Sequence, residues 1–405
     1  MRIAIVTESF PPDVNGVAHS VVRVAEHLVR RGHQPMVIAP QPASAGPRER
    51  ADHRARDAAL PYLVLRVPSV PTPGYPQFRL GLPGRELPTA LRAHGTDVVH
   101  LASPFVLGAR GVAVARALGL PSVAVYQTDV AAYARAYRVR VTEAAAWRWL
   151  RYVHNAANRT LVPSTATATA LHEHGIHRIR LWQRGVDSVR FHPHRRSTAL
   201  RHALAPDGEI LVGYVGRLAP EKRVELLAGA SELPGVRVVV VGDGPAAPAL
   251  RRDLPNALFL GPRHGLQLAR IYASLDVFAH TGPYETFGQT VQEAMASGLP
   301  VVAPAAGGPL DLVEPGRTGT LVPPDDPEAF TTAIAELVAD PGRRAAYGRA
   351  GRDAVGGRTW SAIGDELIDH YLAVRSEETG IDRTGTAGTG GTRPGRLFRP
   401  RQAAA

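Results

Sequence analysis

The chain has 405 residues, which exceeds the size at which a single hydrophobic core keeps growing, so two domains of similar length are expected. Apolar residues make up 44% of it, and it has neither a membrane-length apolar run nor a signal segment, so we expect a soluble protein that is not secreted. The absence of cysteine excludes disulfide bonds, zinc–thiolate sites and cysteine nucleophiles, and the 16 histidines show no HExxH-like spacing.

The positive net charge limits the classes of binding partner that are expected but does not select one of them. Lysine and arginine outnumber aspartate and glutamate by 47 to 36, which gives a formal net charge of +11. Such a charge favours nucleotide phosphates, acidic lipid surfaces or nucleic acid. Because arginine far exceeds lysine and alanine is abundant, a compositional bias of the source genome explains part of this basicity equally well.

Short apolar runs alternate with helix-length segments along the chain, as they do for strands that are buried on both faces of a parallel sheet. In the first half these runs are 2–6, 35–39, 62–67, 97–101 and 122–126. The rhythm restarts after a polar interval near 188–208, with runs at 209–215, 236–241, 257–260, 276–279 and 300–303. Two such arrays predict an α/β protein with two doubly wound, Rossmann-like domains.

We therefore divide the chain into an amino-terminal domain, 1–188, and a second domain, 189–358. Within the first, segment 42–60 is rich in charge, proline and alanine and has no usable periodicity. It is predicted to be a mobile surface loop.

The carboxyl-terminal part is expected to contain one helix and a tail. The helix, 359–376, should pack against a large surface, and it is a candidate to cross back to the first domain. Its apolar stripe consists of Trp360, Ile363, Leu367, Tyr371 and Leu372. The glycine-, threonine- and arginine-rich segment 377–405 cannot bury a core and is expected to be disordered.

Two turns in the second half carry candidate phosphate-binding groups. Arg217 and Lys222 flank the turn after the strand at 209–215, where ligands of parallel sheets bind, and both could reach a diphosphate. Solvated turn residues are the ordinary explanation for such a pair. The next turn contains Gly242 and Gly244 but no third glycine of a dinucleotide fingerprint, so a nicotinamide site is disfavoured.

The fourth apolar run of the second half is followed by the most specific stretch. A loop presents Glu285, and a helix is predicted to begin near Gly288 and to include Glu293. Backbone amides from Phe287 to Gln289 favour phosphate, whereas the two carboxylates suit the hydroxyl groups of a sugar and a ribose. Taken alone, the two glutamates could be ordinary charged residues of a helix. The neighbouring turns with their candidate phosphate-binding groups favour a ligand-binding site.

In the first half, a long turn ends with Asn15 and Gly16 just before an amphipathic helix. Glycine at a helix start could let the backbone approach a phosphate, and ordinary turn geometry is the alternative. Segment 128–160 mixes arginines with tyrosines and tryptophans. It is either an interfacial helix that binds anionic lipid or a buried aromatic face with solvated arginines.

Five motifs together resemble the family-four retaining glycosyltransferases of the GT-B fold. They are SFPPDVNG at 9–16, RGVD at 184–187, GRLAPEK at 216–222, GDGP at 242–245 and ETFGQTVQEAMASGLPVV at 285–302. The likeness extends to about residue 375, and it is greatest to actinobacterial GDP-mannose-dependent α-mannosyltransferases that act on lipid or inositol-type acceptors. It implies two parallel sheets that face an interdomain cleft.

The resemblance implies roles in donor binding for four residues of the second domain. Arg217 and Lys222 would hold the donor diphosphate and neutralise the charge that develops as the nucleotide leaves. Glu285 would contact the donor sugar, and Glu293 would contact the ribose hydroxyls.

The resemblance also implies roles for the first domain and for the base. Gly16 would lie near the β-phosphate, and Arg263 and His264 would lie near the base. Many members carry a histidine where this sequence has Gln127, which cannot shuttle a proton but could bind a donor hydroxyl. Asp129 is a candidate acid–base group by position alone.

The expected reaction is retaining transfer of a sugar, mannose from GDP-mannose, to a lipid or a small polyol or glycan acceptor on the first domain. No DxD triplet occurs, so we expect no metal and no cofactor besides the donor. We expect a cytoplasmic protein, peripheral on an anionic inner membrane surface and without a nucleic-acid partner. The alternatives are a UDP-sugar donor, a sugar-nucleotide epimerase or NAD-dependent oxidoreductase, and a basic nucleic-acid-binding protein, which would lack a recognisable reading motif.

Overall fold

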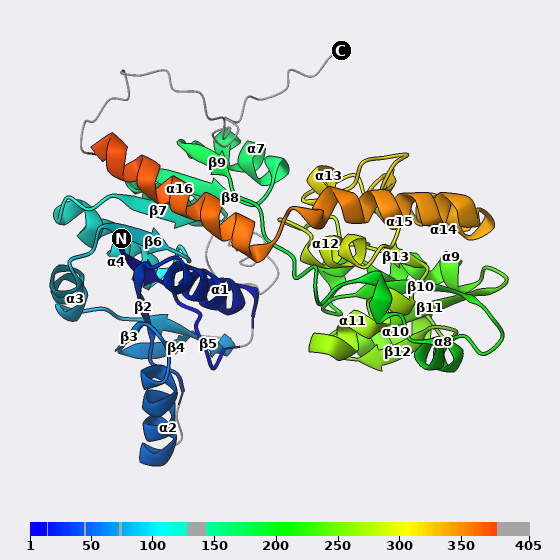
Figure 1. The fold of residues 1–405 in the computed structure, drawn as a ribbon, viewed down its shortest axis with the longest axis horizontal. Coiled ribbons are helices and arrows are strands. Elements are labelled where there is room, and N and C mark those ends of the chain that lie inside the picture. Colours follow the sequence, from blue (N-terminus) through cyan, green and yellow to red (C-terminus); the bar gives the residue numbers. More distant parts are fainter. Residues whose placement is uncertain (14, 44–45, 73–74, 128–142, 379–405) are drawn as a thin grey trace, which may run out of the picture. The chain divides into compact units, whose positions relative to one another are not determined.

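The computed structural model describes residues 1–378 except for 14, 44–45, 73–74 and 128–142. The chain divides into two compact units, which are described separately (Figure 1). Unit 1 comprises residues 1–182 and the described chain from Gly364 onward, and unit 2 comprises residues 183–363. The predicted disordered segment begins inside the last helix, and its residues 379–405 lie outside the described part of the chain.

Unit 1 is built on a seven-stranded parallel sheet with the order β3-β2-β1-β6-β7-β8-β9. These strands are β1 (Arg2–Val6), β2 (Gln34–Pro40), β3 (Leu63–Val67), β6 (Val98–Leu101), β7 (Ser122–Val125), β8 (Arg159–Val162) and β9 (Ile179–Leu181). A separate antiparallel hairpin consists of β4 (Ser69–Thr72) and β5 (Tyr75–Gly81). The helices are α1 (Gly16–Arg30), α2 (Pro47–Ala58), α3 (Glu86–His94), α4 (Val106–Ala117), α6 (Glu143–Ala156), α7 (Thr165–Glu173) and α16 (Trp360–Glu378), whose first turn belongs to unit 2.

Unit 2 contains a six-stranded parallel sheet with the order β12-β11-β10-β13-β14-β15. Its strands are β10 (Ile210–Val215), β11 (Val236–Val241), β12 (Leu258–Gly261), β13 (Val277–Ala279), β14 (Val301–Pro304) and β15 (Gly319–Val322). Its α-helices are α8 (Thr198–Leu204), α9 (Ala228–Ser231), α10 (Ala247–Asp253), α11 (Gly265–Ser274), α12 (Gln289–Ala296), α13 (Pro309–Leu312), α14 (Pro327–Ala339) and α15 (Pro341–Gly356).

Burial on both faces explains why the strands could be predicted as apolar runs. In β10, Leu211 and Val215 belong to one hydrophobic cluster, whereas Val212 and Tyr214 belong to another. Because successive side chains of a strand point to opposite faces, the sheet is covered on both sides. All ten predicted strands form within a residue or two of their expected bounds, and the predicted α/β class is confirmed.

The prediction of a mobile loop at 42–60 is wrong, because α2 occupies most of this segment. Pro47 starts the helix with a preset backbone angle, and Glu49 and Arg56 complement the dipole at its two ends. The helix has no buried residue and therefore lacks the apolar stripe by which a helix is usually predicted.

Helix α16 packs on unit 1, beside α1 in Figure 1. Leu367, Tyr371 and Val374 are buried, as predicted for the first two. The prediction for Leu372 is wrong, since this residue is 44% exposed: it follows Tyr371 directly and therefore points about 100° away around the helix. None of the helices in the described residues is both long and apolar enough to cross a membrane.

Candidate active site

An ion pair joins two predicted site residues at the carboxyl ends of adjacent strands. Lys222 lies on a short 3-10 turn (Pro220–Lys222) after β10, and Glu285 lies on the loop after β13, which pairs with β10. The Lys222 Nζ atom donates a hydrogen bond of 2.9 Å to Oε2 of Glu285, and each side chain is 22% exposed. The hydroxyl of Thr281 donates to the Lys222 carbonyl at 2.6 Å and so ties the two loops together.

The electrostatics of this pair keep Glu285 ionised. Burial raises the pKa of Glu285, but the charges of Lys222 and His280 and the hydrogen bond from Lys222 outweigh it and lower the pKa to about 2. Lys222 is the only lysine among the 405 residues. The Glu285 carboxylate can therefore accept hydrogen bonds from hydroxyl groups, and the Lys222 ammonium group can donate them to a phosphate.

Arg217 lies on the same turn as Lys222 but makes a different ion pair. Its guanidinium donates to Glu221 at 2.8 Å, with 44% and 34% of the two side chains exposed, and its carbonyl accepts from the Tyr214 hydroxyl at 3.1 Å. A surface pair of this kind contributes at most about 1 kcal/mol, so an incoming phosphate could replace Glu221 at small cost.

Two glycines allow the loops around the pair to approach closely. Gly242 has a φ of +141°, and a Cβ atom there would lie 1.9 Å from the carbonyl oxygen of Gly216. A Cβ atom on Gly308 would lie 2.1 Å from the Phe287 carbonyl oxygen, and the Gly308 amide donates to Glu285 O at 2.7 Å. The turn that contains Gly242 and Gly244 thus has a packing role.

Helix α12 follows the Glu285 loop and carries Glu293. Gly288, with a φ of +94°, precedes the helix, and the Phe287 side chain is buried in the core, which leaves only its backbone for a ligand. Burial raises the pKa of Glu293 to about 7, although hydrogen bonds with Tyr272 and Gln289 lower it. The Glu293 carboxyl is therefore partly protonated near neutral pH.

Arg184 is a charged residue near the pair that was missed as a site residue. Burial lowers the pKa of Arg184, while the charge of Glu285 raises it. Gln289 and Gln292 of α12 fix its segment by donating to the carbonyls of Gly185 at 3.3 Å and Arg184 at 3.1 Å. The RGVD motif at 184–187 was recognised in the sequence, but no function was assigned to its arginine.

Arg263 and His264 lie on an exposed loop between β12 and α11. Arg263 Nη1 donates to the Pro262 carbonyl at 3.0 Å, and His264 immediately precedes α11. Their contact with a base stays a prediction.

The amino-terminal turn of unit 1 is explained largely by helix capping. The Asn15 side-chain oxygen accepts from the amides of Val17 and Ala18, both at 3.0 Å, and its amide donates to the Ser9 hydroxyl at 3.0 Å. The ordinary explanation thus accounts for Asn15. Gly16 is the exposed first residue of α1, and its contact with a phosphate stays a prediction.

Gln127, which stands in place of the family histidine, lies just after the end of β7. Gln127 donates from Nε2 to the Ala102 carbonyl at 2.8 Å. That bond orients the Gln127 side chain toward the end of β6, the neighbouring strand. Asp129 lies outside the described residues.

Comparison with known proteins decides the family. The family described as Glycosyltransferase Family 4 matches residues 14–190, and Glycosyl transferases group 1 matches residues 196–354. A protein of Mycobacterium tuberculosis named GDP-mannose-dependent alpha-mannosyltransferase is 50% identical over 94% of this chain and 98% of its own, and one of Mycolicibacterium smegmatis with the same name is 50% identical over 92% and 98%. This chain belongs to glycosyltransferase family 4. The predicted resemblance is confirmed.

A solved structure supports the fold of this glycosyltransferase. The Anabaena protein HepE in complex with UDP has a TM-score of 0.73 and 20% identity, covering 92% of this chain and 100% of that one. At that identity the match concerns the fold alone. It confirms the GT-B class of the prediction.

The glycosyltransferase buries a further carboxyl group in unit 1 that was not predicted. Glu8 is 1% exposed and accepts from the Ser103 hydroxyl at 2.6 Å and from the amides of Leu107 at 2.6 Å and Gly108 at 3.2 Å. Burial raises its pKa to about 7 against these hydrogen bonds. Since the residue before α4 provides no side-chain cap, Glu8 caps this helix from the loop after β1.

Helix α6 of the glycosyltransferase has both buried and exposed aromatic side chains. Trp147 is buried and stacks on His174 with ring centres 3.6 Å apart, as the buried-face alternative held. Trp149 and Tyr152 are 41% and 51% exposed. Residues 128–142 lie outside the described part, so the lipid-binding alternative stays a prediction.

Proposed function

We propose that the chain is a retaining α-mannosyltransferase that uses GDP-mannose. The observation that carries this proposal is the 50% identity, over nearly the whole length of both chains, to two proteins with that donor in their names. The Lys222–Glu285 pair supports it, because one ionised group suits a diphosphate and the other suits sugar hydroxyls.

Donor binding would use the charged groups of unit 2. Arg217 and Lys222 bind the diphosphate and stabilise the charge that develops when the bond to the anomeric carbon breaks. The amides from Phe287 to Gln289 add to this stabilisation at the start of α12. Glu285 accepts from sugar hydroxyls, and Glu293 accepts from the ribose.

The transfer is proposed to need no metal ion. The cationic side chains of unit 2 would neutralise the diphosphate instead. In the described residues, no three histidine, aspartate or glutamate side chains gather as they would around a metal. Transfer should continue in EDTA, and activity that disappears with EDTA and returns with Mg²⁺ would overturn this part.

The acceptor is proposed to be a lipid or a small polyol or glycan that binds unit 1. Gly16 would approach the β-phosphate, and Gln127 and Asp129 would serve the reacting groups. We place the enzyme on the cytoplasmic side, peripheral to an anionic membrane.

A panel of nucleotide sugars tests the donor. GDP-mannose should raise the melting temperature of the protein and be hydrolysed slowly without acceptor, because a ligand that binds the native state stabilises it. UDP-glucose should do neither. A response to UDP-glucose without one to GDP-mannose would overturn the proposed donor while leaving the transferase class intact.

A further inference from the structure

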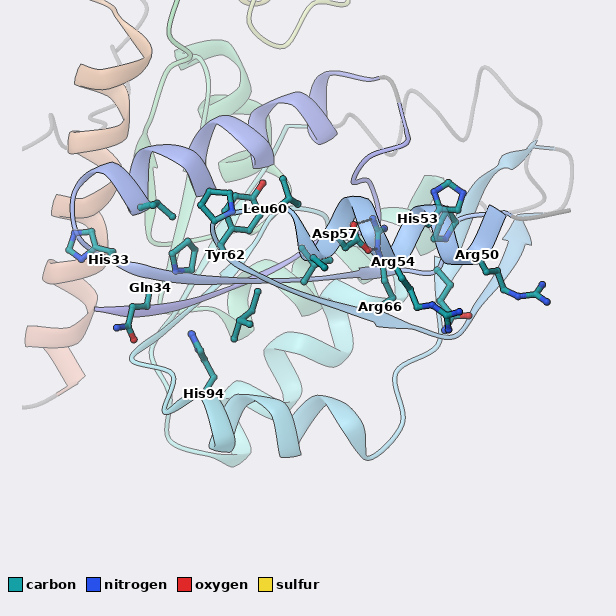
Figure 2. Close-up of a pocket in the computed structure, with 18 residues that line it drawn as sticks. His33, Gln34, Arg50, His53, Arg54, Asp57, Leu60, Tyr62, Arg66 and His94 are labelled. Atoms are coloured by element: carbon teal, nitrogen blue, oxygen red, sulfur yellow. Dashed lines mark hydrogen bonds and ion pairs between the residues drawn. The ribbon is translucent and has the colours of Figure 1, made fainter. Parts of the chain in front are cut away.

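A groove in unit 1 is explained by the way α2 is attached to the sheet. It has a volume of about 870 Å³ and lies between α2 and β3, the edge strand (Figure 2). Asp57 of α2 accepts two hydrogen bonds of 2.9 Å from Arg66 of β3, which also donates to the carbonyls of Pro40 and Pro11. The charged groups at this contact satisfy one another, so the groove assigns no ligand.

Tyr272 of α11 places a hydroxyl group inside the core of unit 2. Its side chain is fully buried, and its ring contacts Phe191 and Phe278 with ring centres 5.5 and 5.6 Å away. A buried hydroxyl is normally hydrogen-bonded. It donates to the carbonyl of Thr290, in the first turn of α12, at 3.3 Å, which is long for an O–H···O bond. This weak bond leaves the hydroxyl able to serve a second acceptor.

The second acceptor is the carboxyl group of Glu293, three residues after Thr290 on α12. Burial and the charge of Glu293 raise the pKa of Tyr272 well above its usual value, so the hydroxyl keeps its proton at every pH of an assay. Glu293 is partly exposed, whereas Tyr272 is closed off from solvent. Tyr272 therefore cannot touch a bound donor, and any effect on donor binding must pass through Glu293.

Tyr272 counteracts the burial of Glu293. Burial raises the pKa of Glu293 to about 7, and among the groups that lower it the hydrogen bond of Tyr272 exceeds that of Gln289 and the charge of Arg190. Asp187 raises this pKa but forms an ion pair of 3.4 Å with Arg190, so the two charges act on Glu293 with opposite signs. The phenol hydroxyl is thus the main group that favours the carboxylate form of Glu293.

We propose that Tyr272 is a positioning residue that aims the Glu293 carboxylate at the ribose hydroxyls of the donor. A carboxylate has about four lone-pair sites, so a bond from Tyr272 leaves others for the ribose. The partner is neutral, unlike Lys222 beside Glu285, and therefore orients the carboxylate without adding a charge. The inference rests on the proposed function, in which Glu293 accepts from the ribose, and it adds the group on which that contact depends.

The test measures the affinity of the full chain for GDP-mannose by calorimetry between pH 6 and pH 8.5. Tyr272→Phe removes the hydroxyl and keeps the ring between Phe191 and Phe278. At pH 7 this variant should bind about two- to tenfold more weakly, which is the effect of one hydrogen bond. The midpoint of its pH profile should move to higher pH, because the ionised carboxyl has lost a donor. The loss should therefore shrink toward pH 8.5.

A double-mutant cycle tests whether Tyr272 acts through Glu293. In a chain that already carries Glu293→Gln, adding Tyr272→Phe should change the affinity by less than about twofold. A loss as large as in the unsubstituted background would overturn the proposal. A loss of the same size at every pH would overturn it too, because that is what a merely structural role of the hydroxyl would give.

The matched control is Tyr371→Phe, the same change at a fully buried tyrosine of unit 1 whose hydroxyl lies 2.5 Å from Nδ1 of His100. It should lower the resistance to urea but leave the pH midpoint of donor binding in place, and an equal shift in both variants would refute the role of Tyr272. Both variants keep their rings, so circular dichroism should show both folded.

The role of Tyr272 and the proposed role of Glu293 can fail separately. A pH profile that Glu293→Gln leaves unaltered would contradict the contact between Glu293 and the ribose. A midpoint that Glu293→Gln abolishes but Tyr272→Phe does not move would overturn the role of Tyr272 alone.

Discussion

Lys222 donates a hydrogen bond of 2.9 Å to Glu285, and it is the one residue of this arginine-rich chain whose side chain carries an ammonium group. An ammonium is a compact point charge, whereas a guanidinium needs a wider, planar partner. Lys222→Ala should lower kcat/KM by about 10²- to 10³-fold, as losses of charge-stabilising groups do. Lys222→Arg keeps the positive charge and should therefore retain part of the kcat/KM that Lys222→Ala loses. Steady-state kinetics with GDP-mannose measures both.

The single lysine also offers a direct readout. Reductive methylation with ¹³C-formaldehyde labels Lys222 and the chain terminus, so one side-chain signal reports on the site. GDP-mannose should shift this signal, and Lys222→Arg should remove it. Donor binding that leaves the signal unchanged would contradict the diphosphate role of Lys222.

The raised pKa of Glu293 predicts pH-dependent donor affinity. The ionised carboxyl is the better acceptor for ribose hydroxyls, so the affinity for GDP-mannose should rise between pH 6 and 8 as this group with a pKa of about 7 loses its proton. Glu293→Gln should weaken binding about tenfold at pH 8 and flatten the pH profile. Calorimetric titrations measure both effects. The exposed Glu328→Gln is the control, and a pH profile that Glu293→Gln leaves unaltered would contradict the assignment.

Glu8 predicts a pH dependence of stability with the opposite sense. Its pKa rises from 4.5 to about 7 on folding, so its contribution to stability is fully present below about pH 4.5 and is lost as the pH rises through about 7. Glu8→Gln stays neutral at all pH values. The variant's unfolding free energy relative to the unsubstituted chain should therefore be higher at pH 8 than at pH 5 in urea denaturation. Parallel curves at the two pH values would refute the buried titration.

Neighbouring residues of α16 should differ sharply in their effect on stability. Tyr371 is fully buried, with its hydroxyl 2.5 Å from Nδ1 of His100, whereas Leu372 is 44% exposed. Tyr371→Ala should destabilise unit 1 by about 3–5 kcal/mol, as for other large aromatic truncations in a core. Leu372→Ala should stay within about 0.5 kcal/mol. Urea unfolding distinguishes them, and equal effects would mean that the packing of this helix is different.

Strand β8 shows why some strands could not be predicted from the sequence. β8 begins with Arg159, a charged residue that interrupts the apolar pattern yet is only 8% exposed. Its charge is compensated by Glu377, and His370 lies 3.1 Å from its guanidinium. Both partners lie more than 200 residues away, so no local pattern could indicate that an arginine belongs in this strand.

The pair Lys222–Glu285 was predictable only in part. Each residue follows an apolar run, which indicates the carboxyl end of a strand. Their contact depends on β10 and β13 being neighbours in the sheet, although two strands separate them in sequence. The place of Arg184 beside the pair could not be predicted, because its segment is held to α12 through backbone carbonyls. A contact made by the backbone leaves little trace in the sequence.

The position of α16 has a consequence for the order of folding during synthesis. Unit 2 is one continuous stretch, so it can fold as soon as it leaves the ribosome. Unit 1 is begun first but lacks the helix whose Asp365 binds His27 and Arg31 until all of residues 183–363 have been made. At usual elongation rates that delay lasts roughly 10 to 40 s. The half that is translated first is thus the half that is completed last, and the apolar surface that α16 covers stays exposed until then.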